Sequence, residues 1–388
     1  MQISGENEDV DDVSIYVHIP FCTKKCPFCN FYVVPDHIRY HEPLLQALLR
    51  EWRMRLPQLQ GKRVRSLYFG GGTPTKLPLE AFASIFQEIE QAKLLFSPQC
   101  EITLEANPED LTLDLLKQYK LLGINRLSIG AQSFVQKELV VLGRSHDVDT
   151  SLRAFDWAHV AGFDNISLDL MLELPLQTQE SLKKTLSTLQ NIKIHHLSLY
   201  NLIFEPHTVF GKKREEMAPL LPSEEEKLAL LEEAVTSIQS LGLMRYEISA
   251  FARPGHASVH NTGYWRGRPF LGLGPSAFSY WEHRRFSNIA HLQRYISFLA
   301  AGKLPVSFEE SLSLERRQRE LFVIQLRLLE GVSQSQFEAK HGPLDPTFTK
   351  ELESQQKMGL LYFEDTTRSW ILTKKGILFY DSLASELI

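Results

Sequence analysis

Six strand-like segments alternate with six amphipathic helical segments between residues 13 and 240 of this 388-residue chain. The strand-like segments cover 13–19, 66–69, 101–105, 126–130, 165–170 and 196–200. The helical segments cover 37–55, 79–94, 111–121, 148–161, 179–190 and 223–240. Repeated strand–helix units form parallel sheets, because each helix carries the chain back to begin the next strand on the same side. The alternation therefore predicts an α/β fold whose parallel sheet is open or curled into a partial barrel.

The last part of the chain has a different pattern. Helical segments near 315–330, 333–340 and 347–358 precede two strand-like pieces, 360–363 and 370–372. Helices followed by a hairpin predict a small C-terminal α+β domain of winged-helix-like type. We divide the chain into four parts, which are an acidic N-terminal tail (1–12), the partial barrel (13–250), a connecting region (251–310) and the C-terminal domain (311–388).

Composition and charge exclude several classes of protein. With 43% hydrophobic and 23% charged residues, the chain has the composition of an ordinary folded protein. Its formal net charge of −5 produces no general attraction to nucleic acid or anionic lipid, and the segment 349–354 (TKELES) is not a basic recognition surface. We therefore expect no nucleic-acid partner.

The sequence predicts a cytoplasmic protein. Its apolar stretches are shorter than the roughly 18–20 residues that cross a bilayer, so no membrane span is expected. The segment 1–12 has no apolar core of the kind that secretory signals contain. Because thiols stay reduced in the cytoplasm, disulfides are not expected among the cysteines of this chain.

Three of the four cysteines share one eight-residue stretch with the spacing C-x3-C-x2-C; they are Cys22, Cys26 and Cys29. Such a cluster indicates a metal centre rather than a disulfide framework. A structural zinc ion needs four ligands, and His18 or His37 would complete that set. An iron–sulfur cube instead uses three thiolates for three irons and leaves the fourth iron open. Cys100 stands alone beside a strand-like run and is interpreted as a small buried hydrophobic residue.

The residues around the cysteines read Tyr16-x-His18-Ile19-Pro20-Phe21-Cys22-x3-Cys26-Pro27-Phe28-Cys29. This string resembles the cluster loop of the radical S-adenosylmethionine (SAM) superfamily, which follows the first barrel strand. It is similar to the branch that contains oxygen-independent coproporphyrinogen III dehydrogenases and heme chaperones. The resemblance implies a partial (βα)6, TIM-like barrel and a [4Fe–4S] cluster held by the three cysteines. It also implies that SAM binds the open iron and yields a 5′-deoxyadenosyl radical after one-electron reduction.

Polar motifs follow the predicted strands, at the end of a barrel where functional sites are built. The resemblance implies SAM contacts from nine residues, which are Tyr16, Phe28, Gly71, Gly72, Thr73, Glu105, Gln132, Arg144 and Asp169. Each also has a purely structural interpretation. The glycines would form a tight turn, Tyr16 would be a buried strand aromatic, and the polar side chains would form surface ion pairs or cap loops.

A further motif, His260-Asn261-x-x-Tyr264-Trp265, lies after the barrel and is similar to a signature of the same branch. Imidazole is a common axial ligand of heme iron, and aromatic rings pack against porphyrin faces. His260 is therefore a candidate heme ligand. A structural histidine that is hydrogen-bonded within the protein is the alternative.

Two functions of different class follow from the resemblance. One is a dehydrogenase that decarboxylates coproporphyrinogen III oxidatively to protoporphyrinogen IX, and the other is a chaperone that binds heme and delivers it to acceptor apoproteins. The dehydrogenase group carries a further cysteine two residues after the third ligand, where this chain reads Cys29-Asn30-Phe31. That group also has a long N-terminal extension, whereas only 15 residues precede Tyr16 here.

Both differences favour the heme chaperone, with peripheral contact to membrane heme proteins as one mode of delivery. A different radical SAM reaction on another substrate stays open, because the fold alone does not fix the substrate. The acceptor, the oligomeric state, binding of a second SAM and cleavage of SAM also stay open at this point.

Overall fold

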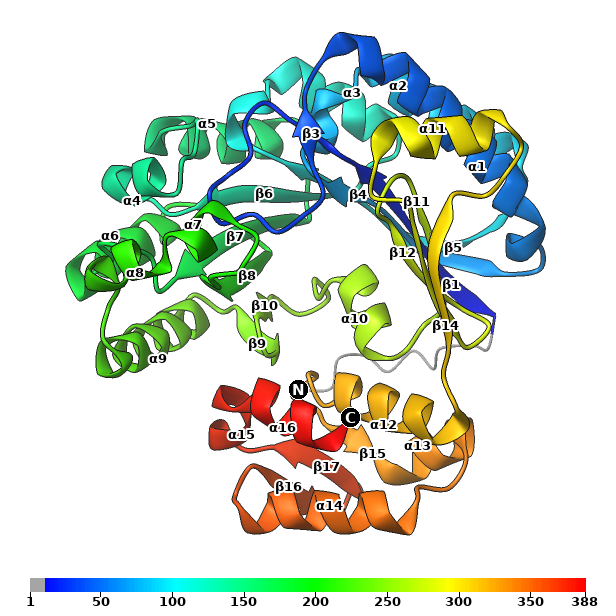
Figure 1. The fold of residues 1–388 in the computed structure, drawn as a ribbon. Helices are drawn as coiled ribbons and strands as arrows, with labels where there is room; N and C mark the ends of the chain where they lie inside the picture. Colours follow the sequence, from blue (N-terminus) through cyan, green and yellow to red (C-terminus); the bar gives the residue numbers. More distant parts are fainter. Residues whose placement is uncertain (1–10) are drawn as a thin grey trace.

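The computed structural model describes residues 11–388, and a curved 12-stranded sheet organises most of them (Figure 1). Six parallel strands form its middle in chain order; they are β1 (Asp12–Ile19), β4 (Arg63–Gly71), β5 (Leu95–Ala106), β6 (Arg126–Gln132), β7 (Ile166–Leu172) and β8 (His196–Asn201). The predicted α/β fold with a central parallel sheet is thus confirmed. Of the predicted tail, residues 1–10 lie outside the described residues, and Asp12 begins β1.

Helices cover the outer, convex face of this sheet (Figure 1). In chain order they are α1 (His41–Leu59), α2 (Leu79–Gln91), α3 (Leu113–Leu121), α4 (Gln136–Val141), α5 (Val148–Val160), α6 (Gln179–Leu189) and α9 (Glu224–Ser240). The start of α9 shows how the sequence determines where a helix begins. Ser223 and Glu226 form a capping box in which each side chain accepts a hydrogen bond from the other residue's backbone N–H.

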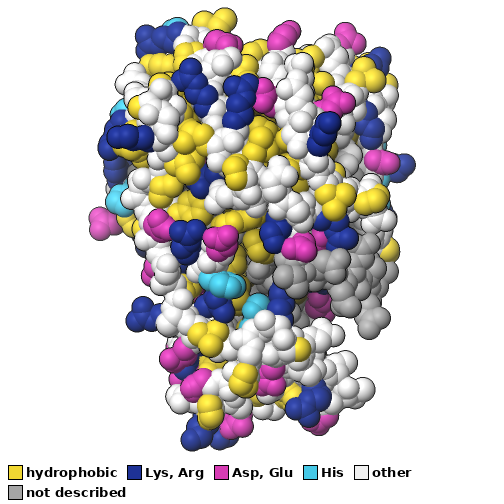
Figure 2. All heavy atoms as spheres, turned by 90° about the vertical axis from the view of Figure 1, so that its right-hand side faces the viewer, with side chains coloured by type: hydrophobic (Ala, Val, Ile, Leu, Met, Phe, Trp, Pro, Cys, Tyr) yellow, Lys and Arg dark blue, Asp and Glu magenta, His cyan; other side chains and the backbone are white. Residues whose placement is uncertain are grey.

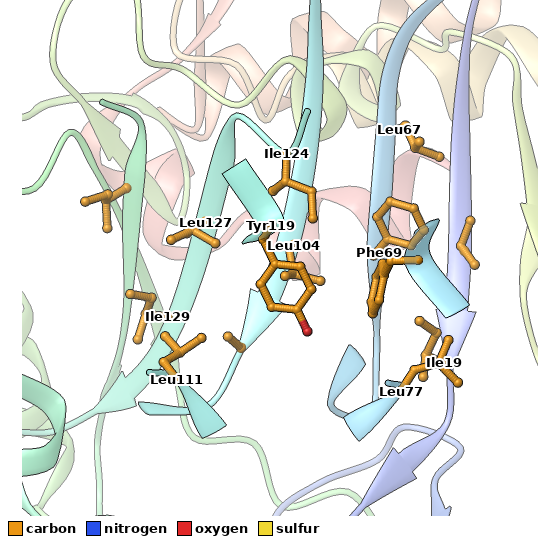
Figure 3. Packing of buried hydrophobic residues seen from close by; sticks show 14 of the residues in the cluster. Ile19, Leu67, Phe69, Leu77, Leu104, Leu111, Tyr119, Ile124, Leu127 and Ile129 are labelled. Atoms are coloured by element: carbon orange, nitrogen blue, oxygen red, sulfur yellow. The ribbon is translucent and has the colours of Figure 1, made fainter. Parts of the chain in front are cut away.

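The core of the barrel lies between the sheet and these helices. Phe69 on β4, Leu104 on β5 and Leu127 on β6 are each at most 1% exposed, and Tyr119 of α3 packs among them (Figure 3). Parallel strands that are covered by helices carry long apolar runs rather than strict alternation. This burial fixes the strand positions, and the polar residues that follow each strand are left at one end of the barrel.

The sheet continues beyond the six parallel strands at both edges. After β8 it adds β10 (Ala250–Ala252) and β9 (Met244–Glu247), which are antiparallel. On the other side β11 (Phe270–Leu273) pairs parallel to β1, and three antiparallel strands follow it; they are β12 (Phe278–Trp281), β13 (Arg284–Asn288) and β14 (Val306–Ser311). Residues 251–310, expected as a connecting region, therefore contribute strands to the main sheet.

Two helices of this region have separate positions. α10 (Val259–Trp265) lies inside the curve of the sheet, between its two edges, whereas α11 (Leu292–Ala300) packs outside against α1 (Figure 1). The motif that contains His260 is thus part of α10 and faces the interior of the barrel.

A smaller C-terminal unit lies below the barrel in Figure 1. Its three-stranded sheet has the order β15-β17-β16 and is covered by five helices; the elements are α12 (Leu314–Gln325), β15 (Val332–Ser333), α13 (Gln334–His341), α14 (Pro346–Lys357), β16 (Leu361–Glu364), β17 (Ser369–Leu372), α15 (Lys374–Leu378) and α16 (Tyr380–Leu387). It has its own core around Phe322, Phe348 and Trp370. The expected α+β character of this unit is confirmed.

The predicted helix 315–330 is wrong at its end, because α12 stops at Gln325. The next residues hydrogen-bond to the barrel instead of continuing the helix. Leu329 N–H donates to the Tyr246 carbonyl, and Ile248 N–H donates to the Arg327 carbonyl. These bonds join the C-terminal unit to β9, so the helix is ended by a tertiary contact that the local pattern does not show. Among residues 11–388, the helices are all too short or too polar to cross a bilayer.

Candidate functional site

The three clustered cysteines follow β1: Cys22 ends the short strand β2 (Phe21–Cys22), and Cys26 and Cys29 lie on the loop between β2 and β3 (Val34–Pro35). Two of their sulfur atoms contact polar side chains from other loops. Cys22 Sγ is 3.5 Å from Thr73 Oγ1, and Arg144 Nη1 donates to Cys26 Sγ at 3.4 Å. The backbone N–H of Cys29 donates a hydrogen bond to the Cys26 carbonyl within the loop. Donors directed at sulfur stabilise thiolates and tune the metal centre that they bind.

The histidines considered as a fourth zinc ligand are engaged elsewhere. His18 is buried in β1, where Nδ1 lies 3.0 Å from the Tyr16 hydroxyl and Nε2 lies 3.0 Å from the Tyr32 carbonyl. The His37 ring accepts the Arg39 N–H and caps a short helix. His18 has no ring nitrogen left for a metal ion in this arrangement, and neither histidine joins the cysteines in a metal-binding group among residues 11–388, so the candidate donors are the three thiols.

Three thiols on one loop match the number of thiolates that bind three irons of an iron–sulfur cube. Among residues 11–388, no three metal-binding side chains converge on one point. A cube bonds each thiolate to a different iron and therefore takes thiols that are spread around a larger group. Burial raises the pKa of Cys22 to about 11 and also raises that of Cys29. Cluster assembly therefore has to displace protons. Cys100, buried in β5, lies apart from this loop.

The glycine motif after β4 holds the cysteine loop closely. Gly71 has φ +112°, and a β-carbon there would lie 2.5 Å from the His18 ring. A β-carbon on Gly72 would lie 2.7 Å from the Phe21 carbonyl oxygen. Only glycine fits this contact without displacing the neighbouring strand end. These glycines thus contact the start of the cysteine loop. A simple tight turn, the alternative expected from the sequence, would not require that contact.

Arg144 connects its own loop to the cysteine loop, to the loop after β5 and to the end of β6. Its Nη2 donates to Asn107 Oδ1 at 2.5 Å and to the Gly130 carbonyl at 3.1 Å, while Nη1 reaches Cys26. Asn107 in turn donates to Thr73 Oγ1 at 3.0 Å. Sequence reasoning missed Asn107, although its position directly after β5 in the string EANP was a signal. Arg144 Nε is buried without a hydrogen-bond partner, which leaves one donor available for an anionic group.

Two carboxylates lie near this arginine, on β5 and β7, which flank β6 in the sheet. Glu105 accepts the Tyr68 hydroxyl at 2.7 Å and Gly71 N–H at 3.2 Å, and burial raises its pKa to about 7. Asp169 accepts the Ser128 hydroxyl at 3.2 Å, and burial raises its pKa as well. No ion pair neutralises either carboxylate within residues 11–388. Shielded carboxylates with free acceptor capacity are suited to hydroxyl groups of a ligand.

The remaining candidate residues surround the same loop. Gln132 ends β6 with φ +67°, where the pairing with β7 is irregular. Such strained backbone is often found at functional sites. Phe28 packs into a small apolar cluster with Leu142 and Phe210, which anchors the cysteine loop to the far side of the barrel mouth. The Tyr16 hydroxyl contacts His18, so Tyr16 packs within the barrel in addition to any contact that it makes with a ligand.

A cavity of about 680 Å³ opens beside this end of the barrel and reaches the C-terminal unit. Small-molecule sites commonly measure roughly 300–1,000 Å³. Aromatic side chains form much of its wall; they are Tyr16, Phe31, Tyr32, Tyr68, Tyr200, Tyr264, Trp265, Phe270, Phe278 and Tyr280. Glu105 and Gly71 also line it, so the cavity adjoins the candidate SAM residues.

His260 lines this cavity and is 1% exposed. The Ser66 hydroxyl donates to Ser14 Oγ, so its oxygen accepts the Nδ1–H of His260 at 2.8 Å. This assignment leaves Nε2 unprotonated, and it accepts the Tyr264 hydroxyl at 2.8 Å. Burial lowers the pKa of His260 to about 3, which keeps the ring neutral. The histidine is therefore fixed in the tautomer whose Nε2 lone pair can bind a metal.

The position of His260 depends on a buried carboxylate that sequence reasoning missed. Glu101 of β5 accepts the backbone N–H groups of Val259 and His260 at 3.0 and 2.9 Å, at the first turn of α10. Arg126 Nε lies 3.7 Å from the same carboxylate. An anion at a helix N-terminus satisfies its free N–H groups. Glu101 thus orients α10 and the histidine on it, across 159 residues of sequence.

Comparison with known proteins agrees with these features. The model of the radical SAM superfamily matches residues 16–189, and that of the HemN C-terminal domain matches residues 312–379. Heme chaperone HemW of Bacillus subtilis is 33% identical over 94% of this chain and 96% of its own length. Heme chaperone HemW of Escherichia coli is 31% identical over 96% of this chain and 97% of its own length.

A solved structure resembles the whole chain as well. Coproporphyrinogen III oxidase (HemN) from Escherichia coli, described as a radical SAM enzyme, superimposes with a TM-score of 0.84. It is 26% identical in sequence, and the match covers 97% of this chain and 89% of that one. From the full-length similarity and the clustered cysteines together, the chain belongs to the radical SAM superfamily, in the branch that contains HemN and HemW.

Proposed function

We propose that this protein is a heme chaperone of the HemW type, which holds a [4Fe–4S] cluster, SAM and heme and delivers heme to acceptor proteins. One observation carries the proposal: an aromatic cavity lies beside the cysteine loop, and a neutral histidine with a metal-binding tautomer lines it. The similarity to curated heme chaperones over nearly the whole chain supports the same function.

We assign the cluster to Cys22, Cys26 and Cys29. When bound, a cluster of this type supplies the electron that cleaves SAM. Arg144 has an unused buried donor and a guanidinium beside Cys26, which suits the carboxylate of SAM. Glu105 accepts ligand hydroxyl groups near Gly71.

We assign the other SAM contacts by their place around the same barrel end; they are Tyr16, Phe28, Gly71, Gly72, Thr73, Gln132 and Asp169. Asp169 would accept hydroxyl groups as Glu105 does.

We assign heme to the aromatic cavity, with His260 Nε2 as the axial ligand. In the described conformation this nitrogen accepts the Tyr264 hydroxyl, so Tyr264 has to turn away when iron binds. Ser66 keeps Nδ1 protonated meanwhile, which directs the lone pair of Nε2 toward the cavity side. Tyr264 thus competes with iron for the same nitrogen.

The second candidate function is coproporphyrinogen III dehydrogenation, which the superposition on HemN favours. The residue two positions after Cys29 argues against it. In this chain that residue is Phe31, which is 65% exposed at the cavity wall, where the dehydrogenases carry a cysteine. A phenyl ring cannot carry out the reactions of a thiol. It adds apolar surface to the cavity wall instead.

The partners of the proposed function are heme and heme-acceptor apoproteins, including membrane heme proteins that it would contact peripherally. A reducing compartment such as the cytoplasm suits the free thiols of Cys22, Cys26 and Cys29.

Heme titration of two variants tests the assignment of His260. We expect His260→Ala to shift the Soret band and weaken heme affinity at least about tenfold, the loss of one good ligand contact. Tyr264→Phe should strengthen heme binding, because it removes the hydroxyl that occupies Nε2. His256→Ala, which changes a histidine outside the cavity lining, should match the wild type. Unchanged titrations for both His260→Ala and Tyr264→Phe would make His260 a structural residue.

A further inference from the structure

The C-terminal unit supplies one wall of the aromatic cavity. Helix α12 contributes Arg317, Glu320, Leu321 and Ile324 to the lining, and the barrel strands contribute Tyr16 and Tyr68. Figure 2 shows this junction from the side, with histidine, basic and acidic side chains at the narrowing between the larger upper body and the smaller lower one. A ligand in the cavity would therefore contact both units.

Three arginines line the cavity, and they differ in how their charge is balanced. Arg285 forms ion pairs with Glu310 at 2.6 Å and Glu320 at 2.7 Å. Arg268 is buried and donates to Ser14 Oγ. The side chain of Arg317 has neither an ion pair nor a hydrogen bond with residues 11–388, and its Nε is buried without a hydrogen-bond partner.

The surroundings of Arg317 increase the local positive potential. It is the fourth residue of α12, close to the positive end of the helix dipole, where a cation is unfavourable. It also lies close enough to His283 and His341 to lower the pKa of each, although burial contributes more. A partly desolvated guanidinium that has no counter-ion would be stabilised by a bound anion.

The cavity wall indicates which anion would fit. Aromatic rings from the barrel favour a flat, apolar ring system, and the guanidinium from the C-terminal unit favours a carboxylate at its edge. SAM has a carboxylate too, but the assigned donor for it, Arg144, does not line this cavity. The combination matches a tetrapyrrole whose propionates remain ionised.

We propose that Arg317 binds a propionate carboxylate of the tetrapyrrole, so that the C-terminal unit holds the ligand by its edge while the barrel holds its ring. This inference rests on the proposed function and deepens it. It also explains why the helix that carries Arg317 forms part of the cavity wall instead of packing entirely on its own unit.

Titration of the full-length, cluster-loaded protein with hemin and with hemin dimethyl ester, in the same buffer, tests the proposal. The Arg317→Gln variant loses one charge-assisted hydrogen bond, so it should bind hemin about tenfold to a hundredfold more weakly than the wild type. Arg317→Lys should recover part of that loss. The ester has no ionised propionate, so wild type and Arg317→Gln should bind it equally.

Arg316→Gln provides the matched control, because Arg316 is the neighbouring arginine, is exposed and does not line the cavity. It should bind hemin like the wild type, and SAM affinity should be unchanged in all three variants. Hemin binding by Arg317→Gln within twofold of wild type would overturn the role of Arg317 alone. Wild-type protein that binds neither hemin nor its ester saturably would overturn the proposed function and this inference with it.

Discussion

Replacing Cys22, Cys26 or Cys29 with Ala will abolish assembly of a [4Fe–4S] cluster, which is the largest effect that we expect. Each thiolate binds its own iron, and no other described thiol is available on this loop to take its place, since Cys100 lies buried in β5. Iron and sulfide analysis after anaerobic reconstitution, together with the charge-transfer absorption of the cluster, measures the result.

Cys100→Ala is the control for this experiment. Its thiol is buried and only 8% exposed, and burial raises its pKa to about 12, so it is not poised to bind metal. We expect this variant to keep its full iron and sulfide content at a modest cost in stability. Normal cluster content in any of the three loop variants would contradict the assignment of the cluster.

Arg144→Met should weaken SAM binding about 30-fold to 100-fold, the second largest effect. The substitution removes the charge-assisted bond assigned to the SAM carboxylate, which is worth about 1.5–3 kcal/mol. It also removes the bonds to Asn107 and to the Gly130 carbonyl, which position the loops after β5 and β6. Calorimetric titration of cluster-loaded protein with SAM measures the change.

Two further variants separate binding from general loss of structure. Arg144→Lys keeps the charge but not the forked geometry, so it should recover only part of the affinity. Arg153→Met changes an exposed arginine on α5 and should bind SAM normally. If Arg144→Met retains the wild-type cluster and binds SAM within threefold of the wild type, Arg144 is not a SAM ligand.

The parallel part of the fold could be predicted because its signal is local. Strands β1 and β4 to β8 are apolar runs between amphipathic helices, and the same pattern repeats six times. Strands β9 to β14 are three to six residues long, and β13 reads Arg284-Arg285-Phe286-Ser287-Asn288. Its arginines form ion pairs with four acidic residues, two of them in β14, instead of covering a core. Such strands carry no hydrophobic periodicity that would reveal them.

The site shows the same division between local and distant information. The cysteine spacing and the glycine motif are contiguous, so the sequence alone indicated them. The contact of Glu101 with the start of α10 and the exposure of Arg317 to the cavity exist only because distant segments meet. Glu101 looks like any strand residue in the sequence, and its role appears only when α10 lies against β5.

The most direct test of the central claim is an anaerobic reaction of the cluster-loaded protein with SAM, a reductant and coproporphyrinogen III. The products are separated by chromatography and read for protoporphyrin, and heme binding is measured on the same preparation. A heme chaperone should bind heme and give no protoporphyrin above the protein-free background. Protoporphyrin formed over multiple turnovers would contradict the account and make the chain a dehydrogenase.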